Sequence, residues 1–137
     1  MIDMDSKEER KHIEVVAGVI IDNGRLFATQ RGYGDFKDGW EFPGGKIERG
    51  ESKAQALERE LREELEIKVE VGDLLRTVEY DYPKFHLTMH CLLAKIKEGT
   101  PHLLEHEASC WVDKEGIDSV PWLPADREIV EEVKNLL

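Results

Sequence analysis

The pattern of apolar and polar positions divides the chain into strands followed by a helix, and this order occurs twice. Residues 13–21 are β-branched and almost continuously apolar, which predicts a buried strand. The turn signal at residues 22–24, which contains Asn-Gly, predicts a hairpin with a second strand over residues 25–30. A short extended segment is predicted at residues 40–42, ended by Pro43 and two glycines. The first part of the chain is therefore predicted to be mostly sheet.

A helical period begins after Ser52, which forms a capping-box signal with the glutamine three residues later. Apolar residues then recur at helical spacing, at Ala54, Leu57, Leu61 and Leu65. Further strands are predicted over residues 68–82, 85–97 and 109–112, and an amphipathic helix over residues 125–137. The order of strands, helix, strands and helix predicts one α+β domain.

The composition limits the classes of partner. The 137 residues include 30 Asp and Glu against 19 Lys and Arg, which gives a formal net charge of −11. Nucleic-acid duplexes and anionic membranes select basic surfaces, so neither is expected as a partner. No apolar run is long enough for a membrane-spanning helix. We expect a small-molecule partner and a monomer or homodimer.

The N-terminus and the cysteines indicate the compartment. Residues 1–12 are polar, lack the apolar stretch of a secretory signal, and are predicted to be a tail before a single domain over residues 13–137. Cys91 and Cys110 lie outside any C-x-x-C spacing and are predicted to be small apolar residues rather than a disulfide. A cytoplasmic protein is the expectation.

Three glutamates on the predicted central helix carry the first chemical signal. Glu60, Glu63 and Glu64 stand at i, i+3 and i+4, so they project from one face and repel one another. Divalent cations bound through carboxylate oxygens would offset that repulsion. The alternative is a solvated face with Glu–Arg pairs, since Arg59 stands four residues before Glu63.

The surrounding spacing resembles the signature of the Nudix hydrolases, G-x5-E-x7-R-E-U-x-E-E-x-G-U, in which U is aliphatic. Residues 45–67, called the Nudix box below, fill every charged position of this pattern. The one departure is Glu66, where the family has a glycine in a turn that often needs positive φ, so strain or a longer helix is expected there. Residues 15–30, 40–45 and 122–126 are similar to the MutT-like branch of the family.

This resemblance implies a Nudix-type α/β/α sandwich with a mixed β-sheet and a catalytic loop-helix-loop. It also implies hydrolysis of a nucleoside triphosphate to a monophosphate and pyrophosphate, with Mg²⁺ or alternatively Mn²⁺. The implied metal ligands are Glu60, Glu63, Glu64 and the backbone carbonyl of Gly45 or Gly44. Water would be the nucleophile.

The resemblance also implies roles for residues around these ligands. Arg59 is expected to orient Glu51 rather than to contact substrate. Either Glu60 or Glu105 would be the base, and Glu105 would be a further metal ligand, with Glu107 as its alternative.

Substrate contacts are open to two interpretations each. Arg31 would reach a phosphate or cap a sheet edge, and Phe42 or Tyr82 would stack on a base or belong to the core. Asp126 would accept a hydrogen bond from an amine such as cytosine N4 or from the N1–H and 2-amino group of guanine, or it would cap a helix. His86 and His90 stand four apart in a predicted strand, and we expect them to be structural or exposed.

The predicted substrate is either a damaged nucleotide of the 8-oxo-dGTP type or a cytidine-type triphosphate. The alternatives are another nucleoside diphosphate derivative, such as a sugar nucleotide or a dinucleoside polyphosphate, and a nucleotide-sensing module without catalysis.

Overall fold

Seven strands join in one mixed sheet in the computed structural model, which describes residues 11–32, 34, 36–102 and 106–137. The strands are β1 (Lys11–Asp22), β2 (Arg25–Arg31), β3 (Trp40–Glu41), β4 (Gly44–Lys46), β5 (Lys68–Asp81), β6 (Phe85–Glu98) and β7 (His106–Val112). The helices are α2 (Lys53–Leu65), α3 (Pro124–Arg127) and α4 (Val130–Lys134), with a 3₁₀ turn η1 (Ile117–Ser119). The predicted α+β class is confirmed.

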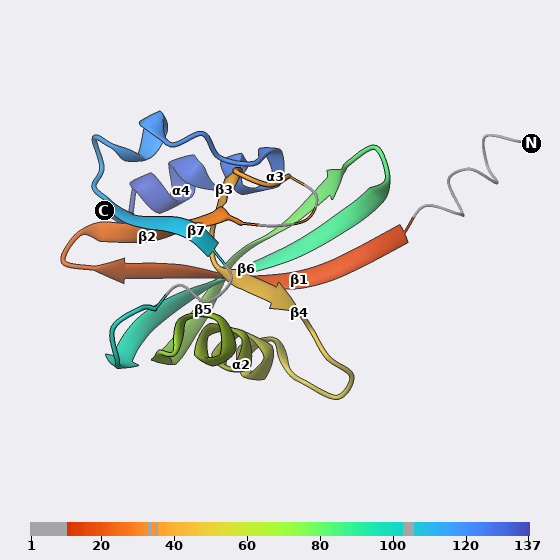
Figure 1. Ribbon diagram of the computed structural model, residues 1–137, viewed down its shortest axis with the longest axis horizontal. Coiled ribbons are helices and arrows are strands. Elements are labelled where there is room, and N and C mark those ends of the chain that lie inside the picture. The colour runs from red at the N-terminus through yellow and green to blue at the C-terminus, as the bar shows by residue number, and fades with distance from the viewer. Residues whose placement is uncertain (1–10, 33, 35, 103–105) are drawn as a thin grey trace, which may run out of the picture.

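β1 is the central strand of this sheet (Figure 1). It pairs in parallel with β6, from Lys11 opposite Phe85 to Ile20 opposite Ala94. It pairs antiparallel with β2 through the predicted hairpin and antiparallel with β4 at its middle. Asn23 in the hairpin turn has a φ of 52°, as the Asn-Gly signal requires. The strand thereby connects both halves of the sheet.

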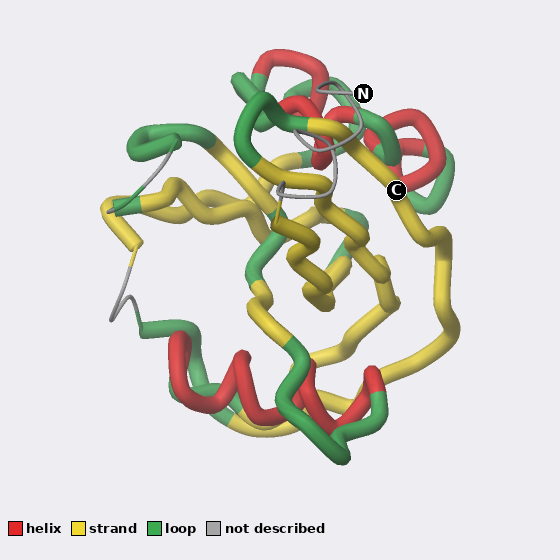
Figure 2. The backbone as a smooth tube through the Cα atoms, turned by 90° about the vertical axis from the view of Figure 1, so that its right-hand side faces the viewer, coloured by secondary structure: helices red, strands yellow, loops and turns green. Residues whose placement is uncertain are grey.

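Helices cover both faces of the sheet, with α2 on one side and α3 and α4 on the other (Figures 1 and 2). Alternate side chains of β1 point to opposite faces. Val16 and Ile20 pack in the apolar cluster under α2, whereas Ala17 and Val19 pack in the cluster that includes α3 and α4. This arrangement is the α/β/α sandwich that the resemblance implies.

α2 begins as predicted. Ser52 Oγ accepts from the backbone N–H of Gln55 at 3.1 Å, and Gln55 Oε1 accepts from the N–H of Ser52 at 2.9 Å. Leu57 is fully buried together with Leu61 and Leu65. Ala54 is the one residue of the predicted apolar stripe that is not buried. It is half-buried, and Ala56 is fully buried in its place.

Strand β4 was not predicted, because Pro43 and two glycines indicate the end of an extended segment. The strand forms because Gly44 lies against β1: a Cβ at Gly44 would stand 1.9 Å from the carbonyl oxygen of Val16. Only glycine permits this close approach of two backbones.

The prediction of one closing helix over residues 125–137 is wrong. The segment forms two short helices, α3 and α4, and the N–H of Ile129 bonds to the carbonyl of Asp126 at 3.3 Å in a tightened turn between them. Ile129 and Val130 are consecutive β-branched residues, which favour helices less than unbranched ones, and both are buried. The break brings both side chains into the core.

Both cysteines are free thiols, as predicted, with Cys91 buried and Cys110 half-buried. Burial raises the pKa of the Cys91 thiol to about 12, so it stays uncharged at neutral pH. Within the described part of the chain, no helix has the length and apolar character needed to cross a membrane.

Glu66 ends α2 in the left-handed conformation, with φ 57° and ψ 40°. Its N–H bonds to the carbonyl of Arg62 at 3.0 Å, so the turn closes the helix as a glycine would. The strain expected from the departure at this position is therefore present, since a side chain in this region costs about 1–2 kcal/mol.

Replacing Glu66 by glycine is expected to raise the free energy of unfolding by about 1 kcal/mol, because glycine adopts positive φ without that cost. Urea unfolding of the parent and of Glu66→Gly measures the change. Glu58→Gly, at an exposed interior position of the same helix, is the control and should lower stability by about 1 kcal/mol. A Glu66→Gly protein no more stable than the parent would contradict the strain argument.

Candidate active site

A cavity of about 630 Å³ opens between α2, the start of β1 and the segment around β3. It gathers nearly all the predicted site residues, which come from distant parts of the sequence: Arg31, Phe42, Gly45, Arg59, Glu60, Glu63, Glu64, Tyr82 and Asp126. Glu51 lies outside the lining but contacts Arg59. Glu105 lies outside the described residues, and of Glu107 only the backbone in β7 is described.

The acidic end of the cavity consists of Gly45, Glu60, Glu63 and Glu64. The three glutamates come from one face of α2, as their spacing predicts, and Glu64 is the most enclosed, with 9% of the residue exposed. Gly45 lies directly against Glu60, since a Cβ there would stand 2.4 Å from its carboxyl carbon. The glycine therefore lets the backbone of β4 approach the carboxylates.

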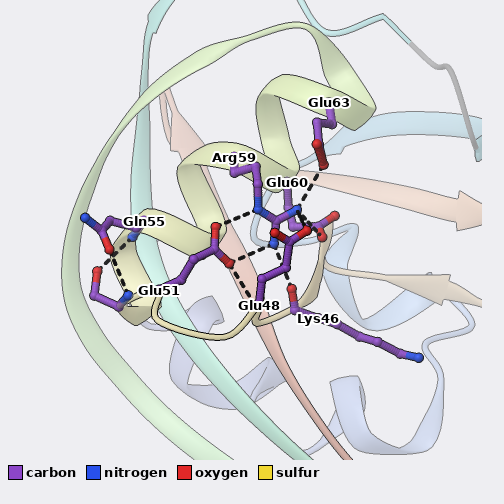
Figure 3. Close-up of polar contacts among 8 residues, drawn as sticks. Lys46, Glu48, Glu51, Gln55, Arg59, Glu60 and Glu63 are labelled. Carbon is purple, nitrogen blue, oxygen red and sulfur yellow. Dashed lines mark hydrogen bonds and ion pairs between the residues drawn. The ribbon is translucent and has the colours of Figure 1, made fainter.

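Arg59 is the common partner of the carboxylates around this end (Figure 3). Its guanidinium donates to both oxygens of Glu51, at 2.6 and 2.9 Å, which is the predicted ion pair. It also donates to Glu60 and Glu63, each at 2.9 Å, and to the carbonyl of Lys46 at 2.9 Å. These contacts tie the loop before α2 to the helix.

The same contacts lower the pKa of Glu51. Hydrogen bonds from Arg59, and then from the backbone N–H of Glu48, hold the pKa of the Glu51 carboxyl below its ordinary value. Glu51 is therefore ionised whenever Arg59 is paired with it, which makes the loop-to-helix contact insensitive to pH near neutrality.

The donor set of the acidic end fits a hard divalent cation. All of its side-chain ligand atoms are carboxylate oxygens, and the backbone of Gly45 lies against Glu60. Glu60 and Glu63 are turned toward Arg59. In the described ranges, three possible ligand atoms meet within 4.8 Å at His12, Glu79 and His86, not at these glutamates.

The buried end of the cavity consists of Arg31, Glu41 and Asp126. Asp126 is 4% exposed, and its Oδ2 accepts from the backbone N–H of Phe42 at 3.0 Å. The alternative that Asp126 caps a helix is wrong, because α3 begins after Leu123 and Asp126 lies inside it. Its carboxyl group is therefore held toward the cavity by a contact across the fold.

Glu41 belongs to this end although the sequence did not indicate it. Its carboxylate accepts from Arg31 at 3.1 Å, so Arg31 at the end of β2 has an acidic partner inside the cavity. Burial raises the pKa of Glu41 against the opposing effect of Arg31. A charged residue between Trp40 and Phe42 in an extended segment was the available signal.

The pKa of Asp126 is shifted more strongly than that of Glu41. Burial, followed by the neighbouring charge of Glu41, raises its pKa well above the ordinary value, and the N–H of Phe42 opposes this only in part. The buried end therefore combines one cation with two carboxyl groups that both favour their neutral forms more than usual.

The two aromatic candidates differ in their surroundings. Phe42 is 3% exposed and stacks on Trp122 with ring centres 4.8 Å apart, which is a core position. Tyr82 accepts from the N–H of Ala125 at 3.0 Å, and its ring lies 4.7 Å from that of Phe36. Phe36, which the sequence analysis did not single out, is 38% exposed at the cavity.

Comparison with known proteins agrees with the fold and the site described above. The model of the NUDIX domain matches residues 11–133. An 8-oxo-dGTP diphosphatase of Haemophilus influenzae is 33% identical over 129 residues, which cover 93% of this chain and 95% of that protein. A CTP pyrophosphohydrolase of Escherichia coli is 38% identical over 122 residues, which cover 88% and 90% of the two chains.

A solved structure supports the fold. The solution structure of the E. coli ORF135 protein superposes with a TM-score of 0.79 at 36% identity, covering 94% of this chain and 93% of that one. The chain belongs to the Nudix family, as the resemblance of residues 45–67 implies. It is thus a hydrolase of anhydrides that contain phosphorus.

The titration of Asp126 predicts a pH dependence of stability. Because its pKa is raised on folding, the folded protein binds this proton more tightly than the unfolded chain. The stabilisation of the folded protein by this proton is fully present below the ordinary aspartate pKa, about 3.9. It is lost as the pH rises through the pKa of Asp126 in the folded protein. Asp126→Asn keeps an oxygen acceptor for the Phe42 N–H and removes this loss.

We therefore expect the stability of Asp126→Asn relative to the parent to increase from about pH 4 to about pH 8, as measured by urea unfolding. Asp73→Asn, at an exposed position, is the control for the loss of one carboxylate. Parallel pH curves for the parent and Asp126→Asn would contradict the prediction.

Proposed function

We propose that the protein hydrolyses a nucleoside triphosphate to a nucleoside monophosphate and pyrophosphate with Mg²⁺ or Mn²⁺. The observation that carries this proposal is that one cavity joins the acidic end, suited to cations, to a buried end with hydrogen-bonding groups and aromatic rings. Its volume of about 630 Å³ is in the range of small-molecule sites.

Glu60, Glu63, Glu64 and the carbonyl of Gly45 would hold the cation. A divalent cation bound there would offset the phosphate charges and lower the pKa of a water molecule. Glu60 is the described candidate for the base that takes the proton of the attacking water. Glu105, the other candidate and a further proposed ligand, lies in the part of the chain that is not described.

In this proposal Arg59 and Glu51 hold the loop before α2 against the helix and do not contact the substrate. The guanidinium of Arg59 has its donors directed to protein oxygens of the loop and of α2. Arg31, at the opposite side of the cavity, is the cation proposed to meet a phosphate, and its contact with Glu41 fixes its orientation.

For the substrate we propose a damaged nucleotide of the 8-oxo-dGTP type or a cytidine-type triphosphate, and the two relatives described above are named for these two classes. Asp126 supports either one. An ionised carboxylate would accept from cytosine N4, whereas a protonated carboxyl would also donate to a carbonyl oxygen. The raised pKa of Asp126 brings the protonated form closer to neutral pH.

The proposal extends to the setting of the enzyme. The partner is a small nucleotide, and we propose a cytoplasmic monomer or homodimer with no role for nucleic acid polymers or membranes.

Removing one carboxylate at the acidic end is expected to lower turnover. Glu63→Gln and Glu64→Gln should each lose about 100-fold or more in kcat, because they remove charge from the proposed cation ligands. A panel of normal, methylated and oxidised nucleoside triphosphates with Mg²⁺, with detection of pyrophosphate, measures this. Glu58→Gln, on the same helix but outside the cavity, is the control. Full turnover by folded Glu63→Gln and Glu64→Gln variants would refute the proposal.

The role of Asp126 predicts a change in substrate preference. Asp126→Asn replaces a titrating group by one that both donates and accepts at every pH. We expect the ratio of kcat/KM for 8-oxo-dGTP to that for CTP to rise by about 10-fold at pH 8 and by less at lower pH. One hydrogen bond to the base changes binding by about this factor. An unchanged ratio across this pH range would show that Asp126 does not contact the base.

A further inference from the structure

A second cluster of ligand-forming side chains lies on the opposite face of the strands that line the cavity. His12 on β1 stands directly opposite His86 on β6 in the parallel pairing. Even-numbered positions of these strands, such as Ile20 and Leu92, pack under α2, whereas odd-numbered positions such as Val15 and Leu87 line the cavity. None of the three ligand-forming side chains described next lines the cavity.

Three strands bring their ligand atoms to one place. His12 on β1, Glu79 on β5 and His86 on β6 each offer one atom, and these atoms lie within 4.8 Å of one another. His86 Nε2 is 2.7 Å from Glu79 Oε1. His12 Nε2 is 2.8 Å from Thr88 Oγ1, which in turn donates to Glu79 Oε1 at 2.6 Å. Cross-strand pairing, rather than a loop, thus fixes the arrangement.

A fourth side chain orients one of these ligands. Asp81, the pairing partner of His86 across β5 and β6, places its Oδ1 2.6 Å from His86 Nδ1. A carboxylate on the far nitrogen of a histidine is the usual support of a metal-binding imidazole, because it fixes the tautomer and directs the other nitrogen to the ion. Here that other nitrogen, Nε2, is the one beside Glu79.

The cluster is open to solvent, since His12 and Glu79 are exposed and His86 is half-buried. Imidazole nitrogen and carboxylate oxygen are the ligands of Zn²⁺, whereas Mg²⁺ selects oxygen. Tetrahedral Zn²⁺ would hold its ligand atoms about 3.3 Å apart, so the 2.7 Å contact of His86 with Glu79 needs only a small opening.

We propose that His12, His86 and Glu79, supported by Asp81, form a Zn²⁺ site independent of the Nudix box. The ion completes its coordination with water at the exposed side. It connects the beginning of β1 to the β5–β6 hairpin, which lie at the same end of the sheet (Figure 1). Because the site exists only when these three strands are paired, Zn²⁺ binding raises the Tm of the folded protein.

Titration of the full-length protein with Zn²⁺ in the presence of excess Mg²⁺ tests the site, because Mg²⁺ occupies all-oxygen sites and competes poorly for histidine. The expected result is one equivalent of Zn²⁺ bound by calorimetry, together with a rise in Tm. Co²⁺ serves as a second probe, since its visible absorption reports tetrahedral coordination with nitrogen ligands.

His12→Ala and His86→Ala are each expected to weaken Zn²⁺ binding at least 100-fold and to abolish the rise in Tm. Asp81→Asn is expected to weaken binding by 10- to 100-fold through the orientation of His86. His102→Ala is the matched control, since His102 is another exposed histidine, outside this cluster, and should leave binding unchanged. Glu79→Gln, which keeps the shape of the side chain, covers the case in which a histidine variant does not fold.

Zn²⁺ binding that is absent from the parent under excess Mg²⁺, or that survives all of these substitutions, would overturn the proposal. Nucleotide turnover is measured in parallel and is not a criterion for the Zn²⁺ site, because none of the residues of this site lines the cavity. The failure of the Zn²⁺ site and the failure of the proposed hydrolysis are thereby distinguished.

Discussion

One guanidinium organises the acidic end of the cavity. Arg59 contacts the carboxylates of Glu48, Glu51, Glu60 and Glu63, and through them it joins the loop before α2 to the helix. Four acids share one cation, so the region keeps an excess of negative charge. Such an excess is costly when partly buried unless further cations are near. The same contacts that hold the fold therefore create the need for the ions that the proposed chemistry uses.

The two faces of β1 lie in different surroundings. Odd-numbered side chains in its first half line the cavity, whereas even-numbered side chains pack under α2 or, near the start of the strand, carry polar groups. His12 and Glu14 belong to this second set, and Glu14 accepts from His90 at 2.6 Å. A strand buried on both sides reads as nearly continuous apolar sequence, which is why residues 13–21 predicted it so well. The polar start of the strand marks where the cover of α2 ends.

The sequence predicted the elements whose signals are local. The Asn-Gly turn, the capping box at Ser52 and the strain at Glu66 depend on a few adjacent residues, and all three are present. The closing helix breaks at a local feature, two consecutive β-branched residues, whereas two other differences concern long-range contacts. Gly44 forms a strand only because β1 lies beside it, and Glu41 enters the cavity only through its pairing with Arg31. No local pattern contains that information.

The same distinction applies to the site, because the pattern of the Nudix box fixes which carboxylates share a face but not which way they point. Glu60 and Glu63 are directed to Arg59, a contact that the i,i+4 spacing allows for Glu63 alone. A cation placed between them would compete with the guanidinium for these oxygens, while Glu51 would keep Arg59 in position through two hydrogen bonds. Glu51 therefore matters because it lets the other carboxylates exchange one cation for another without releasing the loop.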